Sequence, residues 1–114
     1  MPFIKSIQSK ACDISVSASA EKSFSLELFG LKISFNADDK ILQCLDKSAP
    51  LKCENGTVDL RIIFDTLYTE IFADFGTVFM GMTYIADSNL NSLSIESKNA
   101  TIHNIRVSEL NSIH

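Results

Sequence analysis

The sequence predicts an all-β protein built as an antiparallel β-sandwich of about eight or nine short strands. Three observations support this fold class. Apolar and polar residues alternate with a period of two over most of the chain, turn-forming residues separate the alternating segments, and no segment has helical periodicity beyond one or two turns. Strands that follow one another so closely, without long crossover helices, are expected to pair antiparallel.

The length of 114 residues suits one domain. Because regular alternation starts only at Cys12, we expect residues 1–10 to be a linker or N-terminal extension. Residues 11–114 are expected to form a single β-sandwich domain, which is long enough to bury a hydrophobic core without disulfides or a metal.

The first half of the chain contains four alternating segments, at residues 12–18, 24–28, 31–35 and 41–45. Polar or turn-forming residues separate them. We expect a break at 19–23, a kink or bulge at Gly30, a turn at 36–40, and a loop at 46–56 that contains Pro50 and an Asn-Gly turn signal.

The second half continues the pattern. Strands are expected at residues 57–64, 69–73, 77–85, 93–96 and 100–107, with turns at 74–76, 87–89 and 97–99. Together the segments predict a sandwich of the jelly-roll or concanavalin-like kind.

Apolar residues on both faces distinguish the segment 60–73. Ile63 points away from the face that carries Ile62, and Phe72 shares a face with Glu70. A sheet with one face in water would be polar there. Two explanations stay open: local burial under a loop, or a docking surface for another domain or subunit, formed by Ile63, Tyr68 and Phe72.

The charge pattern argues against two kinds of partner. The formal net charge is −4, and the ten Lys and Arg residues are spread along the chain, whereas nucleic-acid binding needs a basic footprint. No apolar run approaches the ~20 residues of a membrane span, and no secretion signal is visible. We therefore expect neither a nucleic-acid nor a membrane partner.

The three cysteines, Cys12, Cys44 and Cys53, do not fit a metal-binding spacing, and His103 and His114 lie far from them in sequence. An odd count leaves at least one free thiol. Cys44 alternates with apolar neighbours, which is typical of a small core residue. We expect no metal and no other cofactor. The localisation stays open, with reduced thiols slightly favouring the cytoplasm.

No catalytic constellation is visible. Glycoside hydrolysis needs two carboxyl groups on either side of the bond. Asp65 and Glu70 lie near opposite ends of one strand connection, but no aromatic-lined cleft accompanies them, and no phosphate-binding loop or nucleophile–histidine arrangement occurs. We therefore predict no catalytic residue in this chain.

Four segments, in this order and spacing, resemble one known domain. They are SLELFGLKI at 25–33, LDKS at 45–48, LRIIFDTLYTEIF at 60–72 before a DFG turn, and IHNIRVSELNSIH at 102–114. The chain resembles the C-terminal β-sandwich of glycoside hydrolase family 32, the invertase, levanase and inulinase-like β-fructosidases.

The resemblance implies a role without catalysis. Enzymes of this family carry their catalytic motifs, such as WMNDPNG, on a separate five-bladed propeller, and none of those motifs occurs here. The expected function is therefore that of an accessory domain that stabilises the missing catalytic propeller or its oligomer, such as a homodimer. Two alternatives remain: a fructan-binding module, and a free-standing β-sandwich interaction domain.

The resemblance also supplies candidate residues for binding fructan or fructose. They are Asp65, Glu70, Asp46 and Lys47. Thr66 and Lys47 stand where the family has arginines, and Ser108 and His114 stand where it often has tryptophan. Lysine lacks the planar fork of arginine, and the chain has no tryptophan to stack on a sugar ring. These departures favour the structural role.

Overall fold

The computed structural model describes residues 3–7, 11–53, 56–65, 68–74, 76–84 and 92–109. These residues form an antiparallel β-sandwich without an α-helix, which confirms the predicted fold class. Its nine strands are β1 (Phe3–Ser6), β2 (Cys12–Leu28), β3 (Leu31–Asn36), β4 (Ile41–Cys44), β5 (Lys47–Pro50), β6 (Thr57–Phe64), β7 (Tyr68–Ala73), β8 (Val78–Thr83) and β9 (Ser92–Glu109).

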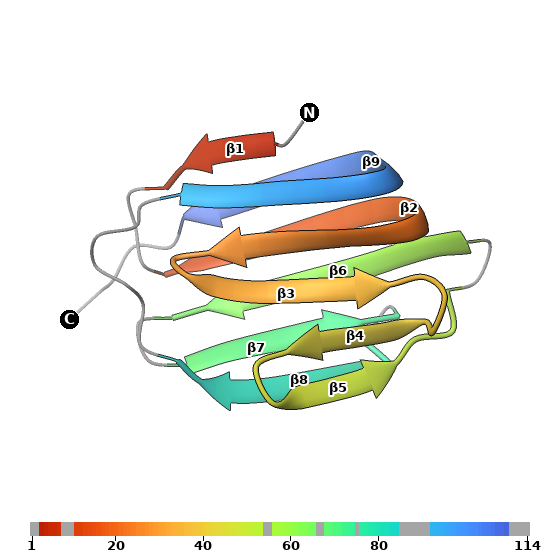
Figure 1. Ribbon diagram of the computed structural model, residues 1–114. Coiled ribbons are helices and arrows are strands. Elements are labelled where there is room, and N and C mark those ends of the chain that lie inside the picture. The colour runs from red at the N-terminus through yellow and green to blue at the C-terminus, as the bar shows by residue number, and fades with distance from the viewer. Residues whose placement is uncertain are drawn as a thin grey trace.

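The strands are arranged in two layers (Figure 1). Layer A contains β1, β3, β4 and β5 with the second half of β2 and the first half of β9. Layer B contains β6, β7 and β8 with the first half of β2 and the second half of β9. Both long strands bend over at one end of the molecule and pass from one layer to the other (Figure 1).

The length of β2 and β9 differs from the prediction. The sequence indicated two short strands on either side of a break at 19–23, and two more on either side of a turn at 97–99. The structure has instead single strands of 17 and 18 residues. Their mutual register shifts between Ala20 and Ser23, and such an irregularity bends a strand without ending it. The polar residues therefore mark a bend, because β2 and β9 stay paired around it.

Three other segments add to or correct the sequence prediction. The expected loop at 46–56 contains β5, which pairs with β4. Gly30 is not a bulge: with Phe29 it forms the two-residue turn between β2 and β3, and both residues have positive φ. Within the expected N-terminal extension, β1 pairs with β9, and Ile7 is fully buried.

Some sequence-based expectations fall outside the described residues. These are the turn at 87–89, the departures at Thr66 and His114, and residues 1–2 and 8–10 of the segment 1–10. The boundary at residue 11 stays a prediction. Within the part of the chain that is described, no helix has the length and apolar character needed to cross a membrane.

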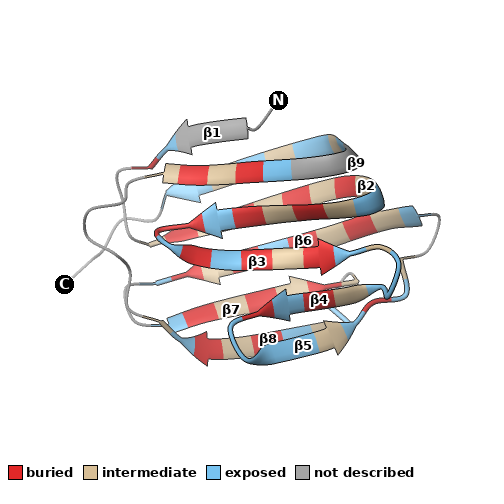
Figure 2. Ribbon diagram, in the orientation of Figure 1, coloured by how far each residue is buried: buried red, intermediate tan, exposed pale blue. Residues whose placement is uncertain are grey.

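The core lies between the layers, as the alternating buried and exposed stripes show (Figure 2). In β3 the inward residues Leu31, Ile33 and Phe35 are buried, and the residues between them are not. The same alternation holds in β6, where Ile62 is buried and Ile63 is half-buried. The period-two pattern of the sequence therefore gave the inward residues of these strands correctly.

One end of the core is filled by aromatic rings. Phe29, at the turn between β2 and β3, packs on Phe64 of layer B with 5.1 Å between ring centroids. Tyr84 packs against Phe64 at 6.3 Å, and its hydroxyl donates a 2.9 Å hydrogen bond to the carbonyl of Phe29. This contact joins the two layers through residues that lie 55 positions apart.

Candidate functional site

The outer face of layer B carries a cluster of three aromatic side chains, Tyr68, Phe72 and Phe79. Together with the neighbouring Ile63 and Glu70, they are here called the aromatic face. Tyr68 is 45% exposed and Phe79 is 53% exposed. Phe72 and Phe79 lie opposite each other on β7 and β8, with ring centroids 5.2 Å apart. Exposed large apolar groups that gather in one place indicate a contact surface.

Gly81 leaves room for two of these rings. A Cβ atom at this position would overlap the hydroxyl of Tyr68 and would stand 3.1 Å from the ring of Phe79. The two side chains therefore occupy the space above Gly81. Glu70 lies directly across the strand pair from Gly81, so its half-buried carboxylate belongs to the same surface.

An ion pair lies at the edge of the aromatic face. Arg61 donates two hydrogen bonds to Asp13, of 3.1 and 2.7 Å, between neighbouring strands β6 and β2. The bond from Arg61 lowers the pKa of Asp13 from its ordinary value of 3.8, and it does so against partial burial, which acts in the opposite direction. Asp13 therefore stays ionised, and charged and polar groups continue the face beyond the rings.

The structure places the predicted docking residues together, since Ile63, Tyr68 and Phe72 all belong to the aromatic face. Ile63 lies opposite Glu70, so a predicted docking residue and a predicted sugar-binding residue share one surface. The sequence analysis missed Phe79. The period-two pattern could have identified it, because Val78, Met80 and Met82 alternate inward along the same strand and leave Phe79 facing out.

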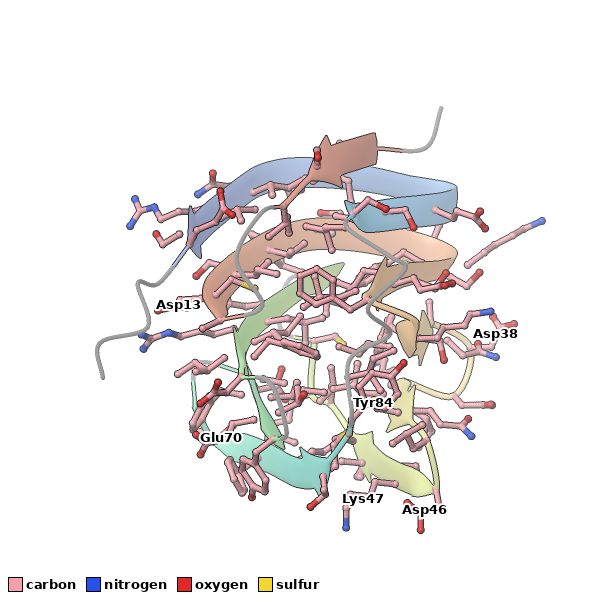
Figure 3. The ribbon with its side chains drawn as sticks, turned by 90° about the vertical axis from the view of Figure 1, so that its left-hand side faces the viewer. Asp13, Asp38, Asp46, Lys47, Glu70 and Tyr84 are labelled. Atoms are coloured by element: carbon pink, nitrogen blue, oxygen red, sulfur yellow. The ribbon has the colours of Figure 1, made fainter. Side chains whose placement is uncertain are left out.

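The predicted sugar-binding residues do not form one cluster. Asp65 follows β6 and is exposed, and its backbone N–H donates to the carbonyl of Tyr68 across the β6–β7 connection. Asp46 and Lys47 are exposed at the hairpin between β4 and β5, in layer A. Figure 3 shows Glu70 on the β7 side and the Asp46–Lys47 pair on a different side of the molecule.

The outer face of layer A differs chemically. It carries small polar and charged side chains and is here called the polar face: Ser25, Glu27, Lys32, Ser34, Gln43, Ser94 and Glu96. Ser25 and Ser94, with Glu27, Lys32 and Glu96, line a shallow polar hollow. No ring contact occurs here among the described residues, so this face offers hydrogen-bonding groups without an apolar platform.

The cysteines have the properties of core residues. Cys12 and Cys44 are buried, and burial raises the pKa of the Cys12 thiol to about 12 and of the Cys44 thiol to about 11. Cys53 is half-buried, and its pKa is also raised, chiefly by burial. Within the described residues no three His, Cys, Asp or Glu side chains are grouped so that they could hold a metal ion.

No protein-family model matches the sequence, and no curated protein matches it. Solved structures do match the fold. An exo-inulinase from Aspergillus awamori superposes with a TM-score of 0.75 at 15% identity, over 92% of this chain and 25% of that chain. A fructofuranosidase variant from Schwanniomyces occidentalis, complexed with fructosylnystose, gives 0.79 at 15% identity, over 98% and 31%.

The chain has the β-sandwich fold of glycoside hydrolase family 32. This confirms the sequence resemblance at the level of the fold. The chain spans about a quarter to a third of the length of these family 32 enzymes. The same architecture also occurs in shorter proteins: the galectin LEC-6 of Caenorhabditis elegans matches with a TM-score of 0.72 at 14% identity, over 96% of this chain and 91% of that chain.

Proposed function

We propose that this chain is a non-catalytic accessory domain of a β-fructosidase-like glycoside hydrolase, and that its aromatic face packs against the catalytic domain. By its resemblance, the whole enzyme would hydrolyse terminal fructosides of sucrose, levan or inulin with retention. The single observation that supports the packing role most directly is the exposure of Tyr68 and Phe79 beside Phe72 on a face that is otherwise expected to be polar.

The chemistry of this face fits an interface between domains. Interfaces between domains of one chain are more polar than permanent subunit interfaces. The aromatic face combines rings with the Glu70 carboxylate, and the Asp13–Arg61 ion pair lies at its edge. A partner with an apolar centre and a polar rim would match it.

The test uses the catalytic propeller of the proposed parent enzyme, which a WMNDPNG motif would identify. The propeller is expressed alone, with this chain, and with the Phe79→Ser variant. We expect the chain to raise the Tm of the propeller and to co-purify with it, and we expect Phe79→Ser to weaken both effects. Ser34→Thr on the polar face serves as the matched control. Equal binding by both variants, or no effect of the chain on the Tm, would contradict the proposal.

A second function, fructan binding, is favoured by one specific observation. Tyr68 and Phe79 lie side by side over Gly81, with the Glu70 carboxylate on the same face. Sugar sites combine apolar faces for the ring with a few polar groups for the hydroxyls. Of the other predicted sugar-binding residues, Asp65 lies nearest to Glu70 in sequence. Asp46 and Lys47 lie at the β4–β5 hairpin and would need a separate contact with the polymer.

Isothermal titration with levan, inulin and fructose separates the two functions. A binding module gives a saturable heat signal that falls on Glu70→Ala and Asp65→Ala, and stays unchanged on Asp46→Ala if only the aromatic face binds. No heat with any of the three ligands would exclude this function and leave the packing role.

A third possible function is that of a free-standing interaction domain. The galectin LEC-6 supports it, because the match extends over 91% of that chain. This function predicts that no propeller is encoded with this chain. We further propose a cytoplasmic location, since the three cysteines of the described residues are free thiols.

A further inference from the structure

The interior of the sandwich contains a polar side chain that makes no hydrogen bond. Thr69, on β7, is fully buried, and its Oγ1 atom has no hydrogen-bond partner among the described residues. The other buried side chains of those residues are apolar. Buried hydroxyls are normally paired, so this exception needs a physical explanation, such as a role in redox chemistry.

A pair of sulfur atoms continues from Thr69 across the core. Met82, on β8, lies directly opposite Thr69, and opposed residues have Cβ atoms roughly 4.5–5.5 Å apart. The Sδ atom of Met82 is 3.3 Å from the Sγ atom of Cys44 on β4, so this contact joins the two layers. Burial raises the pKa of the Cys44 thiol to about 11, so near neutral pH the thiol keeps its proton and donates to the thioether.

The thioether of Met82 can take up an oxygen atom. The thiol of Cys44 bonds to one lone pair of the sulfur, and the other lone pair remains for reaction. A hydroperoxide transfers its terminal oxygen to the sulfur: the O–O bond breaks, an S–O bond forms and the sulfur loses two electrons. The proton passes to the leaving oxygen, which departs as water or an alcohol. The product, methionine sulfoxide, is polar and carries an acceptor oxygen.

We propose that Met82 is an oxidation site that the fold accepts, because the Thr69 hydroxyl donates a hydrogen bond to the sulfoxide oxygen. Thr69 and Met82 point into the core from opposed positions of neighbouring strands. The new acceptor therefore meets a donor whose hydrogen-bonding capacity is unused. A sulfoxide oxygen that is buried among apolar groups alone would instead be unsatisfied, which costs free energy.

Met80 is the matched control within the same strand. It also points inward, and Met80 and Met82 are both 5% exposed. Both belong to β8, the last strand on its side of layer B, so a small oxidant reaches them from the same edge of the sandwich. The residue opposite Met80 is Ile71, whose side chain has no donor. A difference between the two methionines therefore reports the effect of their neighbours.

The experiment compares Met80→Leu, which keeps Met82, with Met82→Leu, which keeps Met80. Each chain is oxidised with hydrogen peroxide in urea, so that access does not limit the reaction. It is then treated with a thiol reductant to restore the cysteines, and refolded. Mass spectrometry confirms one added oxygen on the peptide that contains β8. We expect oxidation to lower the Tm of Met80→Leu less than that of Met82→Leu, because only the Met82 sulfoxide has a donor beside it.

Thr69→Val tests the role of the hydroxyl directly. Added to Met80→Leu, it should raise the Tm of the unoxidised chain, because it removes an unsatisfied buried group. It should lower the Tm of the oxidised chain, because the sulfoxide then lacks its donor. Thr83→Val, at an outward position of β8, should change neither value.

Oxidation of the folded, unsubstituted chain completes the test. Hydrogen peroxide should oxidise Met82 before Met80, since a donor beside the sulfur stabilises the charge that develops on the peroxide oxygens. Fragmentation of the β8 peptide assigns the modified residue. The proposal would be overturned by an equal loss of Tm for the two methionines, or by a Thr69→Val effect of the same sign in both forms. Oxidation of Met80 at the same rate as Met82, or faster, would also overturn it.

Discussion

The two outer faces of this sandwich have the same backbone pattern and opposite chemistry. On layer A the outward positions of β2, β3 and β9 are filled by Ser, Glu and Lys, and on layer B those of β7 and β8 include Tyr68, Phe72 and Phe79. Inside, the buried side chains of the described residues are apolar in both layers, with Thr69 as the exception. Alternation therefore specifies which residues point out, while the identity of the outward residues specifies whether water or a partner covers them.

The largest expected effect on stability comes from a comparison of two phenylalanines in layer B, one pointing inward and one pointing outward. Phe64→Ala removes a fully buried ring that contacts Phe29 and Tyr84, and should lower the free energy of unfolding by about 3–5 kcal/mol. Phe79→Ala removes an outward ring and should cost less than about 1 kcal/mol, mostly through its contact with Phe72. Urea denaturation measures both. A similar loss for both variants would mean that Phe79 is covered within the chain itself.

A pair of threonines sharpens the comparison further. Thr69 points into the core, and its hydroxyl is buried without a hydrogen-bond partner among the described residues. Thr69→Val should raise the free energy of unfolding by about 1–2 kcal/mol, because an unsatisfied buried hydroxyl is replaced by a methyl group of similar shape. Thr83→Val, at the outward position across from Tyr68, should change it by less than about 0.5 kcal/mol. Thermal unfolding of the two variants gives the comparison, and a loss of stability in Thr69→Val would point to a hidden partner of the hydroxyl.

Leu45 is an apolar exception on the side of layer A. It is 50% exposed at the β4–β5 hairpin and has a φ of 54°, a left-handed conformation that is unfavourable for a leucine. Leu45→Asn should stabilise the fold by up to about 1 kcal/mol, since asparagine tolerates this conformation. Leu45→Ala is the control, because it removes the side chain but keeps the backbone cost, and it should give no gain. Chemical denaturation distinguishes the two outcomes.

The smallest expected effect concerns acid stability at the edge of the aromatic face. The folded pKa of Asp13 lies below its ordinary value of 3.8 because of the bond from Arg61. The pair therefore stabilises the fold above the unfolded pKa, and this contribution is lost as the pH falls through the folded pKa. Asp13→Asn should flatten the loss of stability below about pH 4, which unfolding curves at several pH values measure. If the variant loses stability below this pH as steeply as the unmodified protein, then exposure to solvent has removed the contribution of the Asp13–Arg61 pair.

Much of the fold was predictable from sequence. The period-two pattern gave the inward residues of β3 and β6, and the apolar outward positions Ile63 and Phe72 gave part of the aromatic face. The sequence also gave the burial of Cys44, because a small residue among alternating apolar neighbours has few other places to lie.

The strand pattern, the buried faces and the excess of apolar residues around β7 follow from the sequence alone, because they depend on neighbours along the chain. The unbroken course of β2 and β9 through both layers depends on tertiary structure, since a polar segment bends or ends according to whether its partner strand bends with it. Tertiary structure also places Glu70 with the rings and Asp46 and Lys47 apart from them, and makes β8 an edge. Strand order is set by pairing between distant segments, and local pattern contains no record of it.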